Sequence, residues 1–441
     1  MKSGGLWMGI TKGNSGEWSE PYVLLSLLSE GRIYDADANL NVIKDVWHDI
    51  SSIIFKQDSK DKVGSLRYDI NPNDRTVDVF LNGTHLIRIS RDDCKKYANG
   101  LCDAIKNSHS SKGTIDIDKS YSDYLRSIGR NVLKASSKDT PDIWLDMPDA
   151  RNTSNKPLGF SIKSRLSSHL PTIFNSSGAS NIIYEITGDV TEEKISELKL
   201  MVKTHGSVDE NADKDEFVYP DYPLRIKEFK NMKLGLKYHN ARTIKREIDG
   251  SIIITDEAPF EKNLRMIDCC MPQILADMTA EAYFNGIMNM KDLVSVLDWK
   301  DRFGAEPSAD YPFYKKKVQD MLVAMTTSMT AGKVWDGTEG TNGGLIIVKE
   351  DGDIVCYHIF DRNDFREFLL SNMKFECPDN SRYFSTGIVE MDGKYYMSLN
   401  VQIRMGQKKK KDSVRMEEGY YDIDSGEYLD KGPLEKGTIW F

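Results

Sequence analysis

The chain has 441 residues, of which 39% are hydrophobic and 29% are charged, and its formal net charge is −9. This length exceeds what one small core requires and predicts two lobes, and the composition is ordinary for a globular protein. No apolar run approaches the roughly 18 residues that span a bilayer. Residues 1–20 lack the apolar stretch of a secretion signal, so we expect a cytoplasmic protein without a membrane segment.

The negative charge argues only weakly against a nucleic-acid partner, because the local distribution of charge matters more than its sum. The chain has six cysteines, and none of them forms the CxxC pairs that are typical of a zinc site. The spacing therefore favours buried free thiols over a disulfide or a zinc site.

The first predicted element is a helix near residues 15–34. It begins at Ser15 or, because Pro21 fits only near a first turn, at Ser19. Glu17 and Glu20 are three residues apart and lie on one helix face. They suit two roles equally well, as acids that stabilise the helix dipole or as ligands of a metal ion.

Strand patterns follow. Residues 76–90 predict a hairpin that turns at Asn82-Gly83, and residues 115–135 predict a helix. Residues 142–163 predict two paired strands, and residues 180–190 predict a third buried strand. Together these elements indicate an α/β core with a mixed central sheet flanked by helices.

The second half predicts an α+β lobe. Residues 260–300 and 312–330 have helical patterns, and two hairpins turn at Asp351-Gly352 and Asp392-Gly393. Residues 204–216 are polar and read as a linker. We therefore expect a core over residues 1–205, a second lobe over 206–405 and an appended tail of unknown role over 406–441.

The strand pair at residues 142–163 carries the candidate chemistry. Alternation puts Phe160 and Ile162 on one face and Ser161 and Lys163 on the other. Pairing with the strand that starts at Asp142 would place a carboxylate beside an ammonium group. This is the pattern of the metal-dependent PD-(D/E)XK nucleases, except that Ser161 occupies the position of the second acid.

Phosphodiester hydrolysis requires charge neutralisation and a positioned water, and Mg²⁺ bound by carboxylates supplies both. We expect Asp142 to bind Mg²⁺, the carbonyl of Ile162 to add a ligand, and Lys163 to orient the water. A second acid must come from elsewhere. Glu17 and Glu20 are the leading candidates, Glu185 competes with them, and Asp146 and Asp149 are weaker alternatives.

Three long phrases resemble the HpaII family of type II restriction endonucleases. They are GEWSEPYVLLSLLSEGRIYDADANLN, LGFSIKSRLSSHLPTIFNSSGASNIIYEITG and GGLIIVKEDGDIVCYHIF, and the resemblance extends from about Gly16 to about Met405. It implies a Mg²⁺-dependent enzyme that cuts double-stranded DNA at CCGG, with a methyltransferase as functional partner. It also implies Lys163 as the catalytic lysine, Asp142 as the preceding acid, and Glu17 or Glu20 near the metal.

A basic block at residues 225–247 contains eight Lys or Arg residues against two Glu. Such residues read guanine or hold phosphate. The candidates for DNA contact are Arg225, Lys237, Arg242 and Arg246, with Asn175 and Ser176 in a polar loop. A palindromic target cut on both strands suggests a twofold homodimer.

Two other functions remain open from the sequence. A repair-type nuclease of the same fold would cut with looser specificity. A non-catalytic, sequence-specific DNA-binding protein would have lost its acid at Ser161.

Overall fold

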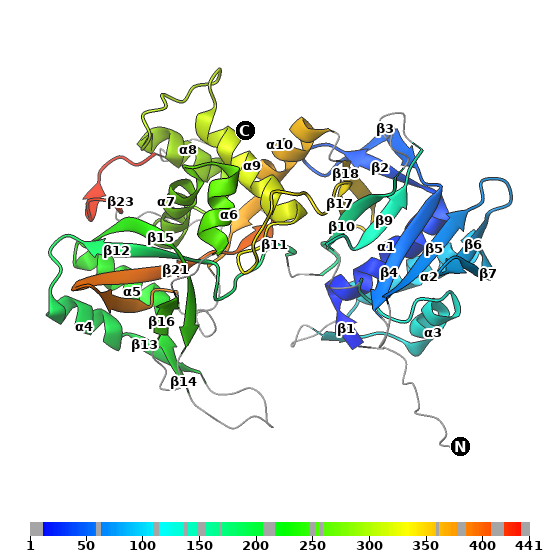
Figure 1. Cartoon of the computed structure of the whole chain (residues 1–441), viewed down its shortest axis with the longest axis horizontal. Coiled ribbons are helices and arrows are strands. Elements are labelled where there is room, and N and C mark those ends of the chain that lie inside the picture. The colour runs from blue at the N-terminus through cyan, green and yellow to red at the C-terminus, as the bar shows by residue number, and fades with distance from the viewer. Residues whose placement is uncertain are drawn as a thin grey trace. The chain divides into compact units, whose positions relative to one another are not determined.

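The chain forms two compact units in a computed structural model (Figure 1). Unit 1 comprises residues 1–171 and 339–368, and unit 2 comprises residues 172–338 and 369–441. The described residues are 12–58, 63–108, 114–135, 140–148, 156–167, 170–205, 217–246, 252–255, 259–358, 361–377, 385–406 and 419–433. The boundaries of these units differ from those of the predicted ranges 1–205, 206–405 and 406–441. The roles assigned to those ranges stay predictions.

Unit 1 is built on a large mixed sheet with the strand order β3-β2-β18-β17-β10-β9-β4-β5-β6-β7. Its strands are β2 (Arg32–Ala36), β3 (Val42–Asp49), β4 (Ser52–Asp58), β5 (Val63–Ile70), β6 (Thr76–Leu81), β7 (Thr84–Ser90), β9 (Ile143–Asp146), β10 (Leu158–Ser164), β17 (Gly344–Val348) and β18 (Ile354–His358). Strand β10 runs parallel to β17, and β18 runs parallel to β2, while the other neighbours are antiparallel.

Helices and a short strand pair complete unit 1. They are α1 (Ser15–Glu30), α2 (Arg91–Lys106), α3 (Lys119–Ser127), β1 (Lys12–Asn14) and β8 (Thr114–Asp116). Helix α1 contacts α2 and β10. Its apolar side chains share one core with both central strands, as Leu24, Phe160 and Ile346 illustrate.

Two start positions were predicted for α1, Ser15 and Ser19, and the structure has the first. The helix begins at Ser15, because Asn14 caps it: the Asn14 side chain accepts a hydrogen bond from the Glu17 amide, and the Glu17 carboxylate accepts one from the Asn14 amide. The alternative start at Ser19 is wrong, and Pro21 lies inside the helix. This reciprocal capping at Asn14 fixes the start of α1.

Two further predictions need correction. The helix predicted over residues 115–135 is shorter, since α3 ends at Ser127 and Gly129 has a left-handed φ of 90°. The strand predicted near 180–190 forms as β12 (Asn181–Thr187), but it belongs to unit 2 and not to the core around Asp142. The Asn82-Gly83 hairpin is confirmed, with φ values of 51° and 83° at its turn.

Unit 2 contains a second sheet with the strand order β16-β15-β12-β21-β20. Its strands are β15 (Gly235–Arg246), β16 (Ile252–Thr255), β20 (Ile388–Met391), β21 (Lys394–Asn400) and β12. Smaller sheets combine β11 (Thr172–Phe174), β22 (Ile403–Met405) and β19 (Met373–Phe375), and pair β13 (Val202–His205) with β14 (Phe217–Pro220). The helices are α4 (Glu192–Leu200), α5 (Tyr222–Asn231), α6 (Pro259–Ile267), α7 (Met271–Phe284), α8 (Met290–Lys300) and α9 (Phe313–Thr327). Helix α10 (Arg362–Asn372) spans the boundary between the units.

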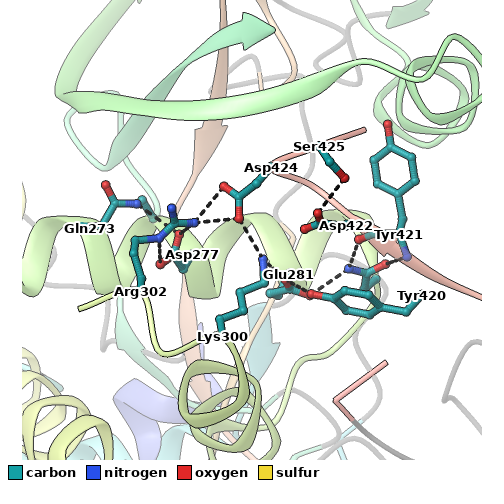
Figure 2. Close-up of polar contacts among 12 residues, drawn as sticks. Gln273, Asp277, Glu281, Lys300, Arg302, Tyr420, Tyr421, Asp422, Asp424 and Ser425 are labelled. Carbon is teal, nitrogen blue, oxygen red and sulfur yellow. Dashed lines mark hydrogen bonds and ion pairs between the residues drawn. The ribbon is translucent and has the colours of Figure 1, made fainter. Parts of the chain in front are cut away.

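The predicted tail contributes a hairpin to unit 2, formed by β23 (Tyr420–Asp422) and β24 (Glu427–Leu429). The hydroxyl of Tyr420 donates to the buried carboxylate of Glu281 on α7 at 2.6 Å (Figure 2). Arg302 lies between Asp277 and Asp424, and donates to both at 2.8 Å. The hairpin is therefore held in the unit by a buried hydrogen bond at Tyr420 and by an exposed ion pair at Asp424. No described helix is long and apolar enough to cross a membrane.

Candidate active site

Asp142 lies where the antiparallel pair β9–β10 ends. Phe160 is the partner of Ile143 in the register, and the Asp142 amide donates to the Phe160 carbonyl at 2.9 Å. This register puts Ser161 opposite Asp142. Lys163 lies two residues further along β10 and therefore on the same face. The predicted pairing of these strands is confirmed.

Hydrogen bonds from β10 hold the Asp142 carboxylate. Its Oδ2 accepts from the Ser161 hydroxyl at 3.0 Å and from the Ile162 amide at 2.7 Å. Among the described residues, its other oxygen, Oδ1, accepts no hydrogen bond. Ser161, in the position of the usual acid, thus orients the acid on the neighbouring strand. The Ile162 backbone amide also orients this carboxylate, and the metal-binding role of the Ile162 carbonyl stays a prediction.

Glu20 on α1 lies within range of the electrostatic influence of Asp142. The Glu20 side chain is only 12% exposed, and its Oε2 accepts from the Ala135 amide at 2.9 Å. Burial, followed by the negative charge of Asp142, raises the pKa of Glu20 to about 8, and Arg130 opposes this shift. When both carboxyl groups are ionised, their negative charges repel each other. A cation bound between them would reduce this repulsion.

Arg130 supports Glu20 from the segment after α3. Its guanidinium donates to Glu20 at 3.4 Å and to the carbonyls of Val132, at 3.1 Å, and Leu133. It also lies 3.8 Å from the centre of the Phe55 ring. Burial lowers the pKa of Arg130. The sequence analysis missed this residue because it assigned the segment to a helix; the Gly129 that ends the helical pattern was the available signal.

Glu17 is already engaged by its own helix. Its Oε2 accepts from the Asn14 amide at 3.0 Å, and its Oε1 lies 3.7 Å from the Lys134 ammonium. Its side chain is still 30% exposed. Capping is thus an observed task of Glu17, and binding of metal stays a prediction.

Glu185, the competing acid, lies on β12 in unit 2. Its carboxylate forms an ion pair with the Lys394 ammonium at 2.8 Å. Glu20, in contrast, lies in unit 1 and within range of the charge of Asp142.

The predicted DNA contacts fall in unit 2 and differ in exposure. Lys237 on β15 is exposed, Arg242 is half-buried, and the Arg246 side chain is outside the described part of the structure. Arg225 is only 4% exposed, and its guanidinium donates to the carbonyls of residues 199, 201 and 386 at 2.9, 3.1 and 2.6 Å. Burial lowers the pKa of Arg225 to about 10. This arrangement favours a structural role for Arg225.

Asn175 and Ser176 precede a loop that lies beside the same strand. The Ile244 amide of β15 donates to the Gly178 carbonyl at 2.8 Å. Asn175 is exposed and Ser176 is half-buried. The structure thus gathers this loop and the basic strand β15 in one part of unit 2.

Potential metal-binding side chains also cluster elsewhere among the described residues. Two sets of three His, Cys or Asp side chains have donor atoms within 4.8 Å of one another there, and Asp142 belongs to neither: Asp35–His48–Cys356 and Asp268–Cys269–Cys270. A cation at Asp142 and Glu20 would thus take most of its ligands from water and phosphate. Mg²⁺ is commonly bound in this way.

Comparison with known proteins decides the family. The model of the HpaII restriction endonuclease family matches residues 14–218 and 224–405. The chain belongs to this family. The match ends where the predicted tail begins, so the β23–β24 hairpin lies outside it.

A curated relative agrees with the family match. The type II restriction enzyme HpaII of Haemophilus parainfluenzae is 29% identical over 394 residues, which cover 89% of this chain and 98% of that protein. No solved structure matches significantly. The chain is thus a type II site-specific deoxyribonuclease, a phosphodiester hydrolase that acts on DNA, and enzymes of this class generally use a divalent metal ion.

Proposed function

We propose that the chain is a Mg²⁺-dependent restriction endonuclease that cuts double-stranded DNA at the palindrome CCGG, with a PD-(D/E)XK-like core in unit 1. The family match supports the reaction, and the resemblance noted in the sequence supports the target. The observation that carries the site is the Asp142 carboxylate, which β10 holds through Ser161 and Ile162 beside the buried Glu20.

The donor set fits Mg²⁺. Asp142 offers Oδ1, Glu20 offers a carboxylate once it loses its proton, and the Ile162 carbonyl and Glu17 are further oxygen donors. A bound Mg²⁺ neutralises charge on the scissile phosphate and favours a hydroxide-like water. Oxygen donors of this kind suit a hard cation better than a thiophilic one.

Each chain residue has its own task in this proposal. Asp142 binds the metal, and Ser161 keeps its carboxylate oriented. Glu20 supplies the acid that the serine replaces, and Arg130 positions it. Lys163, on the same sheet face as Ser161, orients the attacking water or stabilises the developing negative charge.

DNA recognition is assigned to unit 2. Lys237, Arg242 and Arg246 on β15 would hold phosphate or read guanine, together with Asn175 and Ser176. Two copies related by a twofold axis would cut both strands of the palindrome. A methyltransferase would protect the same sites in the host cytoplasm without needing to contact the enzyme.

Digestion of unmethylated plasmid with Mg²⁺ tests the proposal, with EDTA as control and sequencing of the fragment ends. We expect every end to map to CCGG. Mixed ends would support a repair-type nuclease, which the Asp142–Glu20 pair fits equally well. Intact DNA that the folded protein still retains sequence-specifically would support a non-catalytic DNA-binding protein.

A further inference from the structure

Three side chains with metal-binding atoms meet on the large sheet of unit 1, apart from the Asp142 site. They are Asp35 on β2, His48 on β3 and Cys356 on β18. The Asp35 carboxylate oxygen Oδ1 lies 3.0 Å from His48 Nε2 and 3.2 Å from Cys356 Sγ. All three donor atoms lie within 4.8 Å of one another.

The strand order creates this cluster. Strands β3, β2 and β18 are neighbours, and Cys356 is the register partner of Asp35. The His48 side chain is 4% exposed, that of Asp35 is 15% exposed, and Cys356 is fully buried. In the sequence, Asp35 and His48 are 13 residues apart, and His48 and Cys356 are 308 residues apart. The cluster therefore has no recognisable spacing motif.

We propose that Asp35, His48 and Cys356 bind one zinc ion, at a site separate from the nuclease centre. Thiolate, imidazole and carboxylate form a borderline-soft donor set, which suits Zn²⁺ and not the hard Mg²⁺. Tetrahedral zinc bonds imply donor separations of about 3.3–3.6 Å. The two separations from Asp35 Oδ1, 3.0 and 3.2 Å, need to open by only a few tenths of an ångström, and water completes the fourth position.

Charge and protons both balance. Zn²⁺ with one thiolate, one carboxylate and a neutral imidazole has no net charge, which suits a buried location. The Cys356 thiol donates a hydrogen bond to Asp35, so zinc uptake, which requires the thiolate, releases the thiol proton to solvent. His48 binds through Nε2 with its proton on Nδ1. Zinc affinity should therefore increase with pH.

The same contacts also form a metal-free hydrogen-bonded triad, so the test must separate these two states. It must also separate the cluster Asp268–Cys269–Cys270, which is a poorer site. There the Lys317 ammonium already binds the Asp268 carboxylate and repels a cation, and Cys269 is exposed.

The experiment measures metal on the full chain without a histidine tag. After gel filtration in zinc-free buffer, plasma mass spectrometry should find one zinc per chain. After zinc is replaced by cobalt, a thiolate-to-cobalt charge-transfer band should appear in the near ultraviolet. Both signals should disappear in Cys356→Ser and in His48→Gln, and both should remain in the double control Cys269→Ser, Cys270→Ser.

The wild-type protein alone can refute the proposal. Sub-stoichiometric zinc together with the absence of a cobalt band would leave only the hydrogen-bonded triad. Signals that persist in Cys356→Ser and vanish in the double control would assign the metal to the other cluster. Because both measurements are made on the wild type, a variant that fails to fold does not rescue the proposal.

Discussion

The Ser161 hydroxyl donates a hydrogen bond to Oδ2 of Asp142 across the β9–β10 pair at 3.0 Å. Ser161 stands where nucleases of this type usually place a second metal-binding acid. Here its side chain is 7% exposed and engaged with the first acid. The serine thus orients Asp142, and Glu20 is a second carboxyl group of unit 1 that lies within range of the charge of Asp142.

Replacement of Ser161 by alanine should therefore weaken the site without destroying it. Loss of one hydrogen bond to Asp142 costs about 1 kcal/mol or somewhat more, which corresponds to roughly a tenfold slower cleavage at low Mg²⁺. Cleavage rates over a series of Mg²⁺ concentrations measure this. Ser164→Ala removes a hydroxyl from the same strand and should stay near the wild-type rate. A total loss of activity in Ser161→Ala would mean that the serine acts directly in the chemistry.

Asp142→Asn and Lys163→Ala should each lower the cleavage rate by at least about a hundredfold, because each removes a charge that the transition state requires. Sequence-specific DNA binding in Ca²⁺ should persist, since the DNA contacts are assigned to unit 2. Gel-shift titration with a CCGG duplex and with a scrambled duplex reports binding. If affinity for CCGG fell as steeply as cleavage, the two residues would be structural.

The raised pKa of Glu20 predicts how the stability of the metal-free protein depends on pH. Its pKa rises from 4.5 to about 8 on folding, so between these values the folded state binds more protons than the unfolded state. The free energy of unfolding should thus decrease as pH rises from 4.5 to 8, by a few kcal/mol at most. Urea unfolding in EDTA measures this decrease.

Two variants test the origin of this pH dependence. Glu20→Gln cannot ionise and should remove most of the decrease. Asp142→Asn removes the negative charge that is the second cause of the shift, so the decrease should end at a lower pH. A Glu20→Gln profile that coincides with the wild type would assign the titration to another group.

Substitutions at Arg225 and Lys237 should distinguish a structural role of the arginine from a DNA-binding role of the lysine. Arg225→Ala leaves the carbonyls that its guanidinium binds without partners, and should destabilise the protein by at least about 2 kcal/mol. Lys237→Ala should leave the melting temperature unchanged and weaken DNA binding, with a slope of affinity against salt that falls by about one. Calorimetry and salt-dependent titration check both. Normal stability in Arg225→Ala would return this arginine to the DNA-binding set.

Turn residues and alternation in the sequence predicted the hairpins correctly. The Asn82-Gly83 turn, the β9–β10 pair and the hairpins β17–β18 and β20–β21 all form. Each depends on short-range alternation and on turn residues that tolerate a positive φ. The approach of Glu20 to Asp142 depends instead on packing between α1 and the sheet, and the sequence left several acids open.

Long-range pairing explains why the two units differ from the ranges that the sequence predicts. Residues 339–368 return to unit 1, where β17 pairs in parallel with β10, although about 180 residues separate them. Strand β12 is buried as predicted but joins the sheet of unit 2. Periodicity reports that a strand is buried and does not report its neighbours. The buried Arg225 similarly has the same sequence signature as an exposed arginine.

The C-terminal hairpin should be necessary for the stability of unit 2, although it lies outside the family match. Tyr420 is 2% exposed and Tyr421 is fully buried, and the Glu281 carboxylate that accepts from Tyr420 also forms an ion pair with Lys300 at 2.9 Å (Figure 2). Deletion of residues 419–441 would expose this pair to water and remove both aromatic side chains.

We expect that deletion to destabilise unit 2 by at least about 3 kcal/mol, which is the usual cost of removing one large buried aromatic side chain. Deletion of residues 434–441 retains the hairpin and is the matched control, with a melting temperature near that of the full chain. Tyr420→Phe is a finer test. It keeps the ring and removes the hydrogen bond to Glu281, so it should cost about 1–3 kcal/mol, because a charged acceptor loses its donor. Equal melting temperatures for both deletions would mean that Glu281 and Lys300 do not depend on the hairpin to remain buried.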